Sequence, residues 1–130
     1  MRIAVMIDKR HILVVEDDPL VSEVIAAALD DDYHAIVVGS ATEALAHLRD
    51  GGIRLMLLDC TLPGGLDDNL IPEADRVGAS VILMSGDRSR IDKLVDRPRP
   101  FVVKPFTLIS LLTTVEQVLS QDISSRSARS

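Results

Sequence analysis

The chain has 130 residues, the size of one domain, and 47% of them are hydrophobic, which is enough for a sizeable core. Its formal net charge is −6 and only 2% of its residues are aromatic. The negative charge repels phosphate backbones and anionic lipids, and the shortage of aromatic residues excludes a base-stacking surface. We therefore expect no binding to nucleic acid or to a membrane, and a cation or a cationic partner fits this chain better.

The cellular compartment is indicated by Cys60, the only cysteine, which cannot form a disulfide within the chain. Such cysteine usage favours a reducing environment. No apolar run approaches the roughly 18 residues of a membrane span. Charged residues at positions 8–10 split the apolar start of the chain, which argues against a signal peptide. The sequence thus predicts a cytoplasmic protein.

Short runs rich in β-branched residues alternate with helical patterns, which predicts repeated strand–helix units and a parallel sheet. The first unit is a strand at 11–15 followed by a helix. Asp18 is the expected N-cap of that helix, and Pro19 occupies its first position, where the missing N–H costs nothing.

The second unit is a strand at 34–38 and a helix that begins with a capping pattern. Ser40 and Glu43 have the spacing of a capping box, and Gly51 and Gly52 supply the stop.

The second half of the chain continues the alternation. The segment 66–79 predicts a short helix at best because Pro72 interrupts it. We expect residues 1–10 to form an N-terminal extension that either adds an edge strand or frays, and the polar residues 122–130 to form a flexible tail. The other elements are expected as strands at 53–59, 80–85 and 100–103 and helices at 87–96 and 107–121.

Polar side chains lie where four of these strands end. Glu16 and Asp17 follow the first strand, and Asp59, Ser85 and Lys104 come at the ends of the third, fourth and fifth. Ligands of open parallel sheets bind outside the carboxyl ends of the strands. We therefore expect these five side chains to meet at one edge of the sheet.

A cluster of carboxylates requires a compensating cation, because two of them about 4 Å apart repel by roughly 4 kcal/mol at an effective dielectric near 20. Mg²⁺ prefers such oxygen ligands together with a phosphate. Lys104 adds a positive charge, and the Ser85 hydroxyl can donate to a phosphoryl oxygen. An aspartate between a metal and a lysine is suited to attack phosphorus, so Asp59 is the predicted phosphoryl acceptor.

The chain resembles the receiver domain of two-component response regulators over residues 11–121. The resemblance is carried, in the family's order and spacing, by ILVVEDDP (12–19), LMLLDCTLPGG (55–65), VILMSG (81–86) and FVVKPF (101–106). It implies a doubly wound α/β fold of the flavodoxin-like type, with a five-stranded parallel sheet of strand order 2-1-3-4-5. With no output domain in view, we expect a stand-alone receiver.

The resemblance also implies residue roles. Asp59 would accept a phosphoryl group from a histidine kinase, a histidine phosphotransfer protein or a small phosphodonor. Asp17 and Asp59 would bind Mg²⁺ directly, Glu16 would bind it through water, and the Thr61 carbonyl would complete the protein ligands. The domain would then be a signalling module that assists its own phosphorylation and dephosphorylation, and not an enzyme.

Signalling in this family implies a switch. Ser85 would be the switch hydroxyl, Phe101 the switch aromatic and Lys104 the site lysine, joined to Pro105 by a cis peptide bond. The face formed by the fourth helix, fifth strand and fifth helix would change, contact a downstream protein and serve as a candidate homodimer interface. The segment RPRP (97–100) departs from the family pattern and is expected to shorten or deform the fourth helix.

Two other functions remain open from the residues alone. The Asp-x-Thr pattern at 59–61 also fits an aspartyl-phosphate hydrolase of the haloacid-dehalogenase kind, and a degenerate receiver would bind partners without phosphorylation. Cys60 is interpreted as a core residue. His11, His34 and His47 show no ligand spacing and are expected at strand ends or in solvent.

Overall fold

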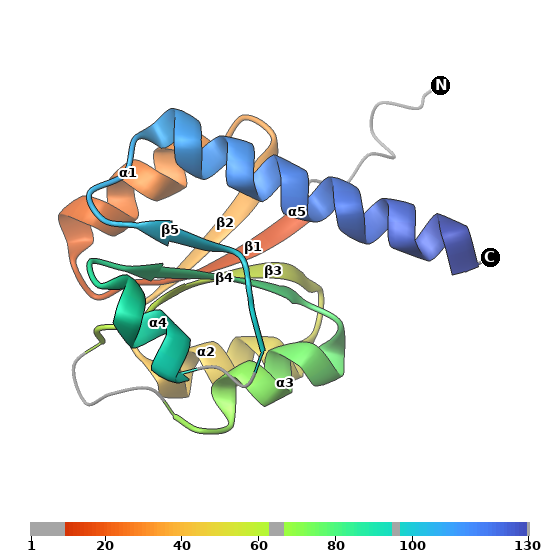
Figure 1. Cartoon of the computed structure of the whole chain (residues 1–130), viewed down its shortest axis with the longest axis horizontal. Helices are drawn as coiled ribbons and strands as arrows, with labels where there is room; N and C mark the ends of the chain where they lie inside the picture. The colour runs from red at the N-terminus through yellow and green to blue at the C-terminus, as the bar shows by residue number, and fades with distance from the viewer. Residues whose placement is uncertain (1–9, 63–66, 95–96, 130) are drawn as a thin grey trace.

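The structure, a computed structural model, describes residues 10–62, 67–94 and 97–129. One parallel sheet has the order β2-β1-β3-β4-β5, which confirms the predicted fold class (Figure 1). The strands are β1 (Arg10–Val15), β2 (Tyr33–Val38), β3 (Ile53–Asp59), β4 (Ser80–Ser85) and β5 (Phe101–Val103). The helices are α1 (Pro19–Leu29), α2 (Ala41–Asp50), α3 (Leu70–Val77), α4 (Arg88–Leu94) and α5 (Leu108–Arg129).

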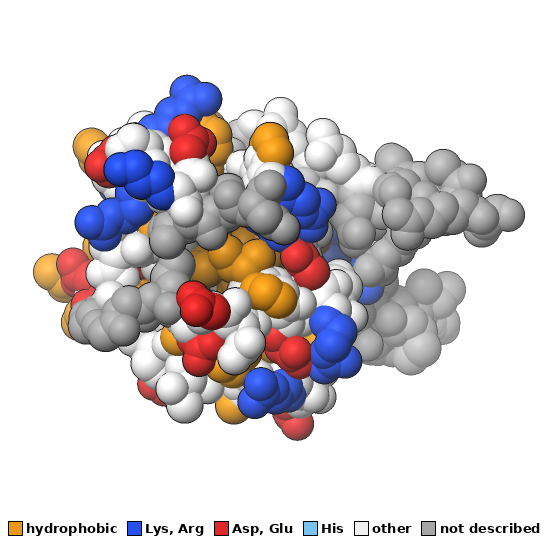
Figure 2. All heavy atoms as spheres, turned by 60° about the horizontal axis from the view of Figure 1, so that its bottom comes forward, with side chains coloured by type: hydrophobic (Ala, Val, Ile, Leu, Met, Phe, Trp, Pro, Cys, Tyr) orange, Lys and Arg blue, Asp and Glu red, His pale blue; other side chains and the backbone are white. Residues whose placement is uncertain are grey.

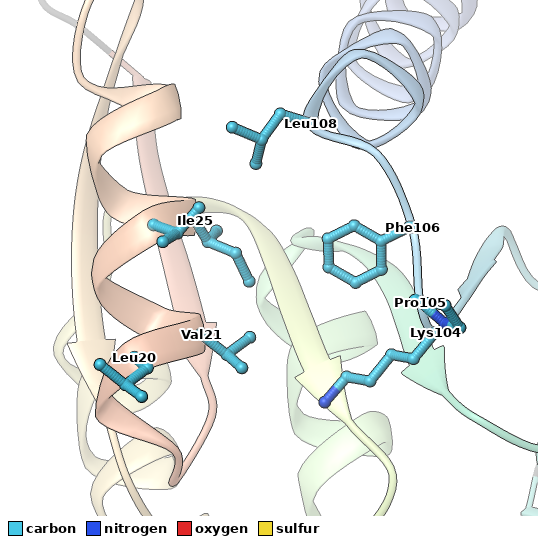
Figure 3. A pocket seen from close by; sticks show the side chains of 8 residues that line it. Leu20, Val21, Ile25, Lys104, Pro105, Phe106 and Leu108 are labelled. Atoms are coloured by element: carbon cyan, nitrogen blue, oxygen red, sulfur yellow. The ribbon is translucent and has the colours of Figure 1, made fainter.

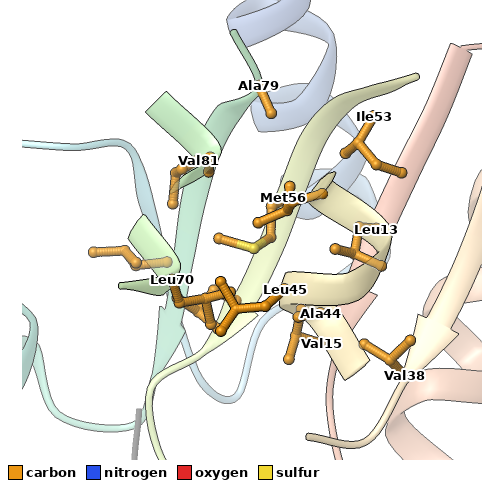
Figure 4. Packing of buried hydrophobic residues seen from close by; sticks show 14 of the residues in the cluster. Leu13, Val15, Val38, Ala44, Leu45, Ile53, Met56, Leu70, Ala79 and Val81 are labelled. Carbon is orange, nitrogen blue, oxygen red and sulfur yellow. The ribbon is translucent and has the colours of Figure 1, made fainter. Parts of the chain in front are cut away.

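Helices cover both faces of the sheet, with α1 and α5 on one face and α2, α3 and α4 on the other (Figure 1). Alternate residues of β3 therefore enter two separate cores, since successive side chains of a strand point to opposite faces. Leu57 packs with α1 and α5, whereas Met56 packs with α2 and α3 (Figure 4). This double burial explains why the central strands are almost wholly apolar and why a carboxylate at the end of β3 stands out.

The predicted helix starts are confirmed. Asp18 caps α1 by accepting a hydrogen bond from the Leu20 N–H at 3.0 Å, and Pro19 is the first helical residue. Ser40 caps α2 by accepting from the Glu43 N–H at 3.2 Å. These caps satisfy backbone donors that a helix start leaves open.

Helix α3 is shorter than the predicted segment and begins at Leu70. Pro72 lies in its first turn, where no intrahelical donor is required, so the proline permits the helix instead of interrupting it. Gly78 ends it with φ 83°, in the left-handed region that favours glycine.

The segment 97–100 is anchored to α3 by a two-bond ion pair. Arg99 donates from Nη1 to Asp75 Oδ1 at 2.9 Å and from Nη2 to Oδ2 at 2.7 Å, with its side chain only 6% exposed. Basic and acidic side chains likewise lie next to one another on the face covered by α2, α3 and α4 (Figure 2). The predicted shortening or deformation of the fourth helix by RPRP stays a prediction, because residues 95–96, which include the predicted helix end, lie outside the described residues.

Helix α5 continues to Arg129, so the predicted helix end at 121 is wrong. The reason is that residues 122–129 contain neither proline nor glycine and give no stop signal. At the other end Arg10 already belongs to β1, while residues 1–9 lie outside the described part. The division into extension, domain and tail stays a prediction. Within the described ranges, none of the helices has the length and apolar character required to cross a membrane.

The Asp75–Arg99 pair yields a test of stability. The hydrogen bond from Arg99 holds the pKa of Asp75 below its ordinary value of 3.8, against the opposing effect of burial. Asp75→Asn is expected to lower the free energy of unfolding by about 1–2 kcal/mol at pH 7, a value reduced because Asp75 remains partly exposed. A lowered pKa stabilises above the unfolded value, so the difference from wild type should vanish as the pH falls below 3.8.

Urea unfolding of both proteins between neutral and acid pH measures this difference. Asp92→Asn, an exposed aspartate on α4, is the matched control and should change stability by less than about 0.5 kcal/mol. Equal losses in the two variants would show that the pair does not hold the 97–100 segment.

Candidate functional site

The predicted site residues meet at the carboxyl edge of the sheet. Asp59 and Ser85 are the last residues of β3 and β4, Glu16 follows β1, and Lys104 follows β5. Lys104 Nζ lies 2.8 Å from Glu16 Oε1 and 3.6 Å from Asp59 Oδ2. The peptide bond between Lys104 and Pro105 is cis, as predicted. The sheet thus brings side chains from three strands into direct contact.

Two carboxylates of this group are buried, since Glu16 is 3% exposed and Asp59 1%. Burial raises the pKa of Glu16, although the hydrogen bond from Lys104 works against it. Burial also acts to raise the pKa of Asp59, but the hydrogen bonds from Thr61, with a smaller contribution from the charge of Lys104, outweigh it, so this pKa is lowered. The same surroundings therefore shift the two carboxyl pKa values in opposite directions, up for Glu16 and down for Asp59.

Thr61 fixes the Asp59 carboxylate from one side. Its backbone N–H and its hydroxyl both donate to Asp59 Oδ1, at 2.9 and 2.7 Å. The other oxygen, Oδ2, faces Lys104. The predicted role of the Thr61 carbonyl as a metal ligand stays a prediction.

Ser85 lies at the same edge, but its hydroxyl is turned to its own loop. It donates to the Asp87 carbonyl at 3.2 Å and accepts from the Asp87 N–H at 3.1 Å. Among the contacts of the described residues, none joins this hydroxyl to Asp59. The predicted partnership with a phosphoryl group would require the hydroxyl to exchange these bonds.

Phe101 begins β5 and is half-buried against the core beneath α2 and α3. The Arg88 guanidinium at the start of α4 stands 5.0 Å from the centre of its ring. A guanidinium at this distance is attracted to the ring face. Sequence reasoning missed Arg88, because no spacing rule links it to Phe101, and the switch role of Phe101 stays a prediction.

The donor set fits a hard divalent cation. Glu16, Asp17 and Asp59 each offer a carboxylate oxygen, and these atoms lie within 4.8 Å of one another. Within the described ranges, this is the one group of three or more acidic, histidine or cysteine side chains that could hold a metal ion. Carboxylates and water suit Mg²⁺ better than a thiolate-seeking or imidazole-seeking metal.

An apolar groove of about 560 Å³ lies beside the carboxyl edge, between α1 and the start of α5 (Figure 3). Two residues of α1 that face it are strongly exposed, Leu20 by 75% and Val24 by 50%. The groove is lined by Leu20, Val21, Val24, Ile25, Lys104, Pro105, Phe106 and Leu108. The sequence did carry a signal for it, because α1 has more apolar positions than one core-facing stripe requires.

The chain is similar to response regulators in sequence. No protein-family model matches it. It is 30% identical over 121 residues to the uncharacterized transcriptional regulatory protein YkoG of Bacillus subtilis, covering 88% of this chain and 53% of that protein. It is 28% identical over 120 residues to the DNA-binding response regulator MtrA of Mycolicibacterium smegmatis, covering 88% and 52%. The chain spans about half the length of these curated relatives.

Solved structures agree on the fold. The signal receiver domain of a putative LuxO repressor protein from Vibrio parahaemolyticus matches with a TM-score of 0.81 at 19% identity, over 95% of this chain and 99% of that one. NtrX from Brucella abortus matches with a TM-score of 0.80 at 28% identity, over 92% of this chain and 29% of that one.

The sheet order and the acidic carboxyl edge define a flavodoxin-like domain of the CheY type. Together with the matches to response regulators, they assign the chain to the receiver domains of two-component response regulators. Receiver domains are signalling domains that bind Mg²⁺ through acidic residues and interact with histidine kinases and effectors.

Cys60 can be tested as a buried core residue. Burial, helped by the neighbouring Asp59 charge, raises the pKa of its thiol to about 11 from 9.0. At pH 8 the thiolate fraction is then about 100-fold lower than in the unfolded chain, so alkylation by iodoacetamide should be slower by at least that factor.

Mass spectrometry of native and urea-unfolded protein gives the two alkylation rates without interference, because the chain has 1 cysteine. Similar rates in both states would support a reactive thiol and contradict its place in the core.

Proposed function

We propose that this receiver domain accepts a phosphoryl group on Asp59 in an Mg²⁺-dependent reaction and signals by a change in its protein contacts. The observation that supports it best is the position of Asp59, a buried carboxylate that lies 3.6 Å from the Lys104 ammonium and beside two further acids. A structural turn aspartate would not require a lysine from another strand.

The reaction follows from these groups. Asp59 attacks the phosphorus of a phosphohistidine or a small phosphodonor; the new O–P bond forms, the bond to the leaving group breaks, and the leaving group takes the electron pair. Lys104 is near enough to donate to a phosphoryl oxygen while it still neutralises Glu16. When bound, Mg²⁺ would offset the negative charge of the transferred group.

The proposed switch starts from the hydrogen bonds that Ser85 makes in the unphosphorylated domain. A phosphoryl group on Asp59 would offer its hydroxyl a charged acceptor, a stronger partner than the Asp87 backbone. Moving Ser85 would disturb the start of α4, where Arg88 contacts Phe101. We propose that this change is transmitted to the face of α4, β5 and α5, which would contact the downstream target or a second copy of the chain.

The phosphodonor would dock on the apolar groove between α1 and the segment 104–106. This groove adjoins the carboxyl edge, and Lys104 belongs to both. Leu20 and Val24 offer apolar area that a histidine kinase or histidine phosphotransfer protein could bury. A small phosphodonor needs no such surface. A comparison of the two kinds of donor therefore distinguishes the effect of a substitution on protein docking from its effect on the transfer reaction.

The haloacid-dehalogenase alternative is not proposed, since the sequence and structural matches are to receiver domains and response regulators. A cytoplasmic location and the absence of nucleic-acid binding stay predictions for this chain.

Incubation with acetyl phosphate and Mg²⁺ is expected to add one phosphate to the chain at Asp59. The added mass should be absent in Asp59→Asn and at least tenfold slower to appear in Asp17→Asn, which loses a metal ligand. Intact-protein mass spectrometry measures the product.

Asp18→Asn is the matched control for Asp17→Asn. It removes the same charge one residue further on, and asparagine still caps α1. Phosphorylation of this variant should proceed as in wild type. An unmodified wild-type mass at saturating donor would show that the receiver is degenerate.

Val24→Lys is expected to slow phosphotransfer from the cognate histidine kinase at least tenfold, because an ammonium group in the groove is costly to bury. Its phosphorylation by acetyl phosphate should be unchanged. Radiolabelled transfer kinetics and the acetyl phosphate assay measure the two routes.

Val37→Lys places the same charge on a valine of similar exposure, 43% against 50%, on β2 and outside the groove. It should leave both routes unchanged. If Val24→Lys takes the phosphoryl group from the kinase at the wild-type rate, the donor docks elsewhere.

A further inference from the structure

Two histidines far apart in the sequence lie side by side at the amino-terminal end of the sheet. His11 in β1 is directly opposite His34 in β2. Their rings are 4.8 Å apart between centroids and inclined by 85°. This end is far from the acidic site, since the five residues from His11 to Glu16 extend about 16 Å along a strand.

Both rings are on the sheet face covered by α2 and α3. Residues two positions further along their strands, Leu13 and Ile36, pack in the core on that face, and alternate residues of a strand share a side. His34 is exposed and His11 half-buried, so an ion from solvent can reach the pair. Among the described residues, neither ring makes a hydrogen bond or an ion pair, and the two rings contact each other.

The ring separation matches that of two imidazoles on one metal ion. With a metal–nitrogen distance of about 2.05 Å and a ring radius of about 1.15 Å, two rings bound at a tetrahedral angle have centroids about 5.2 Å apart, and at a right angle about 4.5 Å. The observed 4.8 Å lies between these values. The centroid separation of the two rings is thus that of two imidazoles that share one ion.

We propose that His11 and His34 form a two-histidine binding site for a divalent transition-metal ion such as Zn²⁺. Neutral imidazole suits zinc, nickel and copper, whereas Mg²⁺ prefers the oxygen ligands of the opposite edge. No third acidic, cysteine or histidine side chain of the described ranges completes the group, so water supplies the remaining ligands. The formal net charge of −6 favours the approach of a cation.

A bound ion would join the edge strand β2 to β1 at the amino-terminal end of the sheet. The site would stabilise the folded chain, because the unfolded chain does not hold the two rings together. This proposal does not rest on phosphorylation or on any residue of the carboxyl edge.

Zinc titration of the untagged full chain, in excess Mg²⁺ to occupy the acidic edge, tests the site. We expect one zinc ion per chain by calorimetry and a rise in the thermal unfolding midpoint. His34→Gln, at an exposed position, should weaken zinc binding at least tenfold and abolish the rise, and His11→Gln should do the same.

His47→Gln on α2 is the matched control and should bind zinc as wild type does, as should Asp59→Asn. Wild-type affinity in His34→Gln, loss of binding in Asp59→Asn, or no binding by the wild-type chain would each overturn the proposal. If His11→Gln fails to fold, His34→Gln decides the outcome alone.

Discussion

The ion contacts of Lys104 allow two carboxylates to be buried at the carboxyl edge of the sheet. Glu16 and Asp59 are almost inaccessible, and the ammonium group lies within 2.8 and 3.6 Å of their oxygens. Carboxylates this close and this buried would otherwise share a proton, because desolvation and mutual repulsion both oppose ionisation. The lysine comes from the edge strand β5, whereas the acids come from the central strands β1 and β3. The lowered pKa of Asp59 thus has a local cause, the hydrogen bonds from Thr61, and a smaller long-range one, the charge that Lys104 brings from the other side of the sheet.

Local sequence signals were sufficient for most of the fold. Asp18 with Pro19 and Ser40 with Glu43 begin helices by bonds that reach only two or three residues, so their residue types alone reveal them. The carboxyl-edge residues were found for a related reason: in a parallel sheet, the last residue of each buried strand must lie on one edge. Helix ends were predicted less reliably, as α5 shows, because a helix continues until a residue such as proline or glycine stops it.

Contacts that depend on three-dimensional register could not be predicted in this way. Arg99 finds Asp75 across 24 positions, and His11 faces His34 only because the register of β1 and β2 places them in one row. In neither pair does the distance along the sequence indicate that the two residues are in contact. The direction of the Ser85 hydroxyl is equally hidden from the sequence, since no spacing rule shows that it donates to the Asp87 carbonyl.

The segment from Lys104 to Phe106 contributes to two surfaces, the acidic carboxyl edge and the apolar groove. Its first residue contacts the acids, and its next two form a wall of the apolar groove, so one short stretch of backbone belongs to both surfaces. A change of charge at Asp59 that displaces Lys104 must therefore alter the groove. Thermodynamic linkage makes such an effect reciprocal: whatever fills the groove changes the affinity of the acidic edge for its ligand by the same factor. If the proposed phosphodonor stayed bound in the groove after phosphoryl transfer, it would therefore change the stability of the phosphorylated state.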